Sequence, residues 1–89
     1  MSYLGNCKIS PGDGWVSLSD AVNFMPNVGD YYNFSLEGDC RIRWCQQDEK
    51  PTNENDGILI YAHNFGYYVK TLDNIWVKAI FFDTLISID

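Results

Sequence analysis

The chain has 89 residues, a length that suits a single hydrophobic core and leaves no room for a second domain. Six basic residues against twelve acidic ones give a net charge of -6, which argues against a surface that follows the phosphates of a nucleic acid. No apolar run approaches the roughly 18 residues of a membrane span, and the N-terminus lacks the pattern of a signal peptide, so neither membrane insertion nor secretion is expected.

The N-terminal third predicts a turn followed by two short extended runs. The turn at 11–14 precedes the apolar run 15–18, and a second run at 21–24 ends where residues 25–29 break the chain. Sustained helical periodicity is missing from both runs, so we expect strands here. Residues 1–14 can form an N-terminal arm.

Residues 30–36 and 39–45 alternate between apolar and polar side chains, which is typical of half-buried strands. The expected inward faces hold Tyr32, Phe34 and Leu36 in the first run and Cys40, Ile42 and Trp44 in the second. Arg41 and Arg43 then point outward. Because a tight turn at 37–39 joins the two runs, we expect a hairpin whose inward side chains form one buried layer.

The second half predicts a surface loop and three more strands. Residues 46–55 are polar throughout, and strands are expected at 58–61, 65–69 and 75–79. Short strands that recur about every ten residues are typical of an antiparallel sandwich or barrel. The expected fold is all-β: one small antiparallel β-sandwich or jelly-roll-like domain over residues 1–89.

The last predicted strand, 82–88, is apolar on both faces. Its expected inner face holds Phe82, Thr84, Ile86 and Ile88, while Phe81 and Leu85 occupy the outer face. A strand with two apolar faces usually has a partner on each, so we expect a symmetric homo-oligomer, a trimer or a dimer. The candidate interface residues are Phe81, Leu85, Trp15, Tyr67 and Trp76.

Residue patterns that support catalysis or cofactor binding are missing. His63 is the only histidine and stands near no metal-ligand motif, so no catalytic residue, metal site or cofactor is expected. Three cysteines cannot all pair within one chain, and Cys40 and Cys45 lie too far apart along one extended strand to bridge. Unpaired thiols of a reducing cytoplasm are expected.

Several segments together resemble a known family. These are Pro51-Thr52, then Asp56-Gly57-Ile58-Leu59, then Ile75-Trp76-Val77-Lys78-Ala79 and a terminal β-branched strand. Over residues 15–88 this order resembles the small β-sandwich virion proteins of tailed bacteriophages. The resemblance implies a non-enzymatic structural protein of the virion, either a capsid decoration or cement protein or a tail module. Such a protein is made in the host cytoplasm and binds other virion proteins of the capsid or tail.

Two alternatives remain open. A carbohydrate- or receptor-binding module would use exposed aromatic rings to stack on sugars, and the candidates are Trp15, Tyr67, Tyr68 and Trp76. A small acidic inhibitor of a host protein would gather its carboxylates on one face and imitate a phosphate backbone.

Overall fold

The computed structural model describes residues 5–22, 24, 26–53 and 55–89. The elements run in the order β1 (Gly5–Ile9), η1 (Pro11–Asp13), β2 (Val16–Ser17), α1 (Leu18–Val22), β3 (Tyr31–Gly38), β4 (Arg41–Gln46), β5 (Ile58–Tyr61), β6 (Asn64–Tyr68), β7 (Ile75–Ala79) and β8 (Thr84–Ile88). Strands account for 49% of the structure and helices for 10%, which confirms the all-β prediction.

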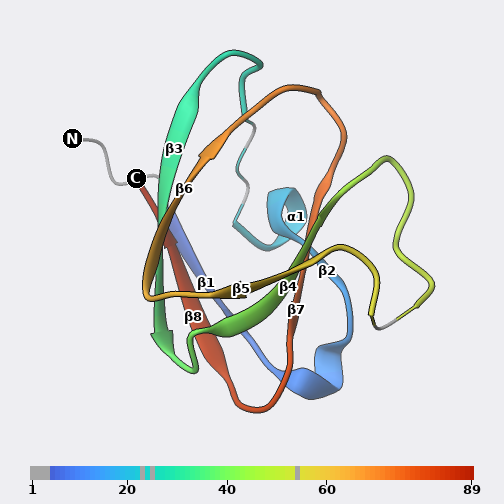
Figure 1. Cartoon of the computed structure of the whole chain (residues 1–89), viewed down its shortest axis with the longest axis vertical. Helices are drawn as coiled ribbons and strands as arrows, with labels where there is room; N and C mark the ends of the chain where they lie inside the picture. Colours follow the sequence, from blue (N-terminus) through green and yellow to red (C-terminus); the bar gives the residue numbers. More distant parts are fainter. Residues whose placement is uncertain (1–4, 23, 25, 54) are drawn as a thin grey trace.

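Two four-stranded antiparallel sheets pack face to face (Figure 1). Sheet A has the order β1-β8-β3-β6 and sheet B the order β2-β7-β4-β5. Among the described strands, β4 and β5 are the one pair that is both consecutive in sequence and hydrogen-bonded in a ladder. Most connections therefore cross from one sheet to the other at the ends of the sandwich.

The expected hairpin of residues 30–45 is wrong, because β3 lies in sheet A and β4 in sheet B. Gly38 makes the crossing possible. Its φ of 85° is a conformation that favours glycine, and a Cβ at this position would lie 2.8 Å from the carbonyl oxygen of Asp83. Alternation could not exclude this arrangement, since an inward apolar face is needed whichever sheet a strand joins.

The expected buried layer nevertheless forms, with its members facing each other across the two sheets. Phe34 lies at its centre, with its ring centroid 5.0 Å from that of Trp44 and 5.2 Å from that of Phe65. Ile42 is fully buried and Tyr32 is half-buried at the margin. The buried residues of the core cluster are Ile9, Leu18, Phe24, Phe34, Leu36, Ile42, Trp44, Ile75, Val77, Ala79, Ile86 and Ile88.

The faces of the last strand are partly as expected. Ile86 and Ile88 are buried, but Phe82 is 68% exposed because it precedes β8, in the turn after β7. On the outer face Leu85 is half-buried between Lys8 of β1 and Glu37 of β3, its register partners. The outer face of β8 is therefore not the broad apolar surface that the sequence predicted.

The N-terminal predictions need two corrections. Residues 5–9 form β1 and pair with β8, so this part of the expected arm belongs to sheet A, while residues 1–4 lie outside the described residues. The second predicted strand is wrong where α1 replaces it. Ser17 was the missed signal, because its hydroxyl oxygen accepts a hydrogen bond from the backbone N–H of Asp20 at the start of that helix. Asn23 and Met25, in the second run and the chain break, also lie outside the described residues.

Candidate functional site

The two tryptophans proposed as interface residues hold a loop in place. Trp15 is only 6% exposed and donates its indole N–H to the carbonyl oxygen of Asn53 at 3.2 Å. Trp76 is half-buried and donates to the carbonyl oxygen of Gln47 at 3.0 Å. The bonds fasten the polar loop between β4 and β5 to β7 and to the residue before β2, so neither indole is available as an exposed platform.

Tyr67 also packs inward. Its ring centroid lies 5.1 Å from that of Trp44, its hydroxyl donates to the side-chain oxygen of Gln46, and burial raises its pKa. Together with half-buried Leu85, four of the five candidates lie in or against the sandwich. Phe81, which is 58% exposed, is the one that faces solvent.

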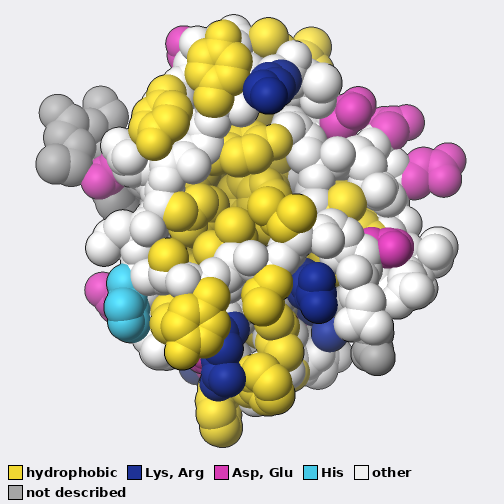
Figure 2. Space-filling model, in the orientation of Figure 1, with side chains coloured by type: hydrophobic (Ala, Val, Ile, Leu, Met, Phe, Trp, Pro, Cys, Tyr) yellow, Lys and Arg dark blue, Asp and Glu magenta, His cyan; other side chains and the backbone are white. Residues whose placement is uncertain are grey.

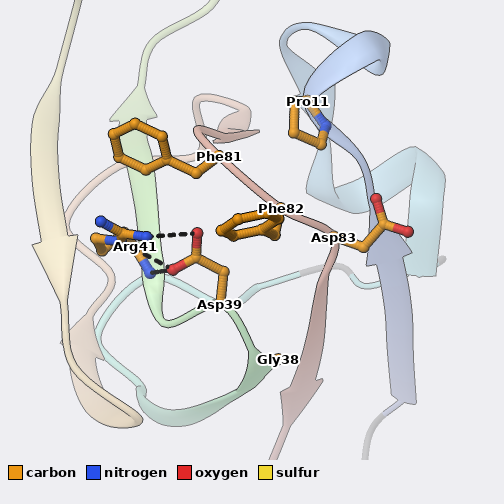
Figure 3. A pocket seen from close by; sticks show the side chains of 7 residues that line it. All are labelled: Pro11, Gly38, Asp39, Arg41, Phe81, Phe82 and Asp83. Carbon is orange, nitrogen blue, oxygen red and sulfur yellow. Dashed lines mark hydrogen bonds and ion pairs between the residues drawn. The ribbon is translucent and has the colours of Figure 1, made fainter.

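Phe81 belongs to a hollow at one end of the sandwich (Figure 3). The hollow has a volume of about 680 Å³. Three segments meet there: η1, the crossing from β3 to β4, and the turn from β7 to β8. Its lining residues are Pro11, Gly38, Asp39, Arg41, Phe81, Phe82 and Asp83.

Arg41 is held rigidly in this hollow. Its Nε and Nη2 donate to the two carboxylate oxygens of Asp39 at 3.0 and 3.3 Å, and its backbone N–H donates to Oδ1 at 3.1 Å. The guanidinium carbon lies 4.2 Å from the centroid of the Phe81 ring, which is cation–π geometry. Figure 3 shows Phe81 and Asp39 on two sides of the guanidinium group.

The Asp39 carboxylate is buried, with 4% of its side chain exposed. The hydrogen bond from Arg41 lowers the pKa of Asp39, although burial acts in the opposite direction. The backbone carbonyl of Asp39 accepts a hydrogen bond of 2.8 Å from the hydroxyl of buried Thr84. Asp39 thus ties the start of β4 to the start of β8, and its carboxylate is occupied by Arg41.

The exposed apolar side chains continue from this end along β5. Among the described residues the large exposed hydrophobic side chains are Val28, Tyr31, Ile58, Leu59, Tyr61, Tyr68, Leu72, Phe81 and Phe82. Tyr61 stands opposite Arg41 in the β4–β5 ladder. Leu59 and Phe81 line a second hollow of about 340 Å³ together with Arg41. We call Leu59, Tyr61, Phe81 and Phe82, which surround Arg41, the Arg41 patch.

Figure 2 shows hydrophobic side chains across the centre of one face of the molecule and again at its lower end, where Lys and Arg side chains lie among them. Sequence reasoning found Phe81 but missed Arg41 and Asp39. It also assigned Phe82 to the core. The available signal was the pair Phe81-Phe82 directly before the turn residue Asp83, since two large apolar groups at a turn cannot both reach the core.

Metal ligands do not gather in the part of the chain that the structure describes. No set of three or more His, Cys, Asp or Glu side chains able to hold a metal ion occurs in the described ranges. No helix of the described part is long and apolar enough to cross a bilayer. Cys7, Cys40 and Cys45 are unpaired, as expected, and burial raises the pKa of Cys7 and of Cys45.

Comparison of the chain with protein-family models, with curated proteins and with solved structures finds no match. The likeness to virion proteins of tailed bacteriophages therefore rests on the sequence segments alone.

Proposed function

We propose that the chain is a non-enzymatic assembly protein that docks onto other protein subunits through the Arg41 patch. The observation that carries the proposal is the exposure of Phe81 and Phe82, 58% and 68%, side by side in sequence next to a fixed guanidinium group. Contiguous apolar surface of this kind on a small domain marks interaction sites. Arginine and aromatic side chains are also the residue types that dominate binding energy at protein interfaces.

The size of the effect supports docking. Covering the exposed parts of Phe81 and Phe82 removes on the order of 250 Å² of apolar surface from water, since each ring side chain offers roughly 200 Å². At about 25 cal/mol per Å² this is worth about 6 kcal/mol before the cost of association is subtracted. Arg41 adds a rigid donor group, because Asp39 and Phe81 already restrict its rotamers.

The proposed setting is the particle of a tailed bacteriophage, and the resemblance of residues 15–88 supports it. There the partners are other virion proteins of the capsid or tail, and the chain forms a dimer or trimer. Mass spectrometry of gradient-purified phage particles tests this setting. Detection of the chain among the virion proteins supports it, and its absence from intact particles contradicts it.

Self-assembly is tested by light scattering at tens of micromolar protein. We expect wild type to exceed the monomer mass and Phe82→Asp to return to it, because a carboxylate in an apolar contact must be desolvated. The matched control is Leu72→Asp, which places the same charge on a 79% exposed leucine outside the patch. A wild-type monomer, or equal masses for the two variants, would remove the patch as a self-association surface.

A sugar-binding role is the second candidate, and one pair of residues favours it. Tyr31 and Tyr68 are 62% and 52% exposed and stand opposite each other in the β3–β6 ladder. Asn33 and Asn64 line a hollow of about 350 Å³ on the same pair of strands. If this platform binds glycans, Tyr68→Ala should lower the affinity for an oligosaccharide that wild type binds on a glycan array.

A further inference from the structure

The edge of sheet B offers a second kind of contact, which rests on the proposed docking function. β5 is one of the two edge strands of this sheet, and its four residues are exposed or half-buried. The backbone N–H of Ala62 donates to the carbonyl of Cys40, and residues 40 and 62 continue the β4–β5 register. Because hydrogen-bonded pairs alternate in an antiparallel ladder, the backbone groups of Leu59 and Tyr61 point away from β4 toward the open edge.

The outer face beside this edge is basic in an acidic protein. Arg41, Arg43 and Lys78, three of the six basic residues, line the hollow of about 340 Å³ on that face. Arg43 and Lys78 stand opposite each other in the β4–β7 ladder. Within the described residues Arg41 is the one of the three with a carboxylate in ion-pair distance. Two like charges directly opposite are unfavourable, so an anionic group between them would relieve their repulsion.

The inner side of the same edge is apolar. Ile58 stands opposite Trp44, whose side chain points into the core, so Ile58 points to the same side of the sheet. It is nevertheless 58% exposed, because it lies at the rim where the core ends. A strand added beyond β5 would thus meet an apolar rim on one face and a basic surface on the other.

From this geometry we propose that β5 receives an extended segment of a partner protein in which acidic residues alternate with apolar ones. An added strand lies about 4.8 Å beyond β5 and about 10 Å from β4, a gap that the long side chains of glutamate and arginine bridge by leaning over β5. Every second side chain of the added strand lies on the face of Leu59 and Tyr61, and the remaining side chains of that strand cover Ile58. Main-chain pairing supplies affinity and the alternation supplies selectivity.

Other occupants fit less well. Two copies paired through β5 would bring no anionic group to Arg43 and Lys78, because the strand itself, Ile58–Tyr61, holds no carboxylate. A nucleic acid has no peptide groups to pair with the open edge, and its dense charge meets a chain of net charge -6. A short acidic segment brings only a few charges and places them where the basic side chains are.

The probe is a fluorescein-labelled peptide of about six residues that alternates glutamate and valine, followed by fluorescence anisotropy at low salt. We expect it to bind at least about tenfold more tightly than the matching lysine–valine peptide, and Arg43→Glu to weaken it by at least about tenfold. Lys70→Glu, the same charge change on an exposed lysine outside this face, should leave the affinity within about twofold.

Three further readouts decide the mode of binding. A backbone N-methylated form of the peptide should bind at least about tenfold more weakly, and the amide resonances of Leu59 and Tyr61 should shift on titration with the unmethylated form. Equal binding of both charge types, full binding of the N-methylated peptide, or stronger binding of a single-stranded oligonucleotide would each overturn the proposal. If the peptide does not bind but Phe82→Asp reduces the mass to that of the monomer, only the β5 proposal is contradicted. If the peptide binds but Phe82→Asp does not change the mass, only the Arg41 patch is contradicted.

Discussion

Replacing Asp39 with asparagine tests how far its ion pair with Arg41 stabilises the fold at the crossing between the sheets. The substitution keeps the shape of the side chain and one acceptor oxygen, so the bonds from the backbone N–H and Nε of Arg41 can persist. It removes the negative charge and turns an amide NH₂ toward Nη2 of Arg41, where the carboxylate accepted a bond of 3.3 Å. The Asp39 side chain is 4% exposed and the Arg41 side chain 33%, so water compensates only in part.

The expected cost is about 1–3 kcal/mol at neutral pH, the range for losing a hydrogen bond between charged groups when one partner is buried. The folded-state pKa of Asp39 is lowered, mainly by the hydrogen bond from Arg41. Its contribution to stability is therefore complete above the unfolded pKa of about 3.9 and is lost as the pH falls through the lower folded value. The difference in the free energy of unfolding between wild type and Asp39→Asn should therefore become smaller as the pH falls from the unfolded to the folded pKa of Asp39.

Urea unfolding followed by tryptophan fluorescence, repeated between pH 7 and pH 2, measures this gap. Asp48→Asn is the control, because Asp48 is exposed in the loop after β4, and its effect should stay within about 0.5 kcal/mol. A gap that is the same at pH 7 and at pH 2, or an Asp39→Asn variant as stable as the control at pH 7, would refute the assignment of the Asp39 carboxylate as a stabilising charged partner of Arg41.

Two other predictions concern the core and the thiols. Phe34→Ala should lower the free energy of unfolding in urea by about 3–5 kcal/mol, a large part of the roughly 4–13 kcal/mol available to a domain of this size. Phe82→Ala should lower it by less than about 0.5 kcal/mol. Similar losses for the two variants would show that Phe34 is not the centre of the core. Because burial raises the pKa of Cys7 and of Cys45, iodoacetamide at pH 7 should modify both far more slowly in the folded protein than in urea, and equal rates by mass spectrometry would contradict this.

The inward faces of the strands could be predicted because burial imposes a period of two whatever a strand pairs with. Phe34, Ile42 and Trp44 are buried as expected. Sheet membership could not be predicted in the same way. Residues 37–39 look like a hairpin turn, but the conformation of Gly38 and the partners of Asp39 are decided by β8, which arrives 45 residues later in the chain at Thr84.

The candidate site was only partly predictable. The alternating pattern was extended to residues that precede the last strand, and this placed Phe82 in the core. The strand β8 begins only at Thr84. Trp15 and Trp76 were expected at a surface because large aromatic rings suit interfaces, yet each indole N–H bonds a loop carbonyl. Those partners depend on the path of the loop, which local patterns do not encode.

The crossing at Asp39 links stability to the proposed docking. Its carbonyl holds Thr84 and its carboxylate holds Arg41, while Arg41 in turn lies against Phe81. Loss of the Asp39 charge therefore weakens the hold on the guanidinium beside Phe81 and lowers the free energy of unfolding through the same contact. Phe82 only lines the hollow and is 68% exposed, so its substitution should alter docking and leave the free energy of unfolding unchanged. Different responses to substitution of Asp39 and Phe82 would therefore distinguish a contact that stabilises the domain from an exposed side chain that takes part in docking.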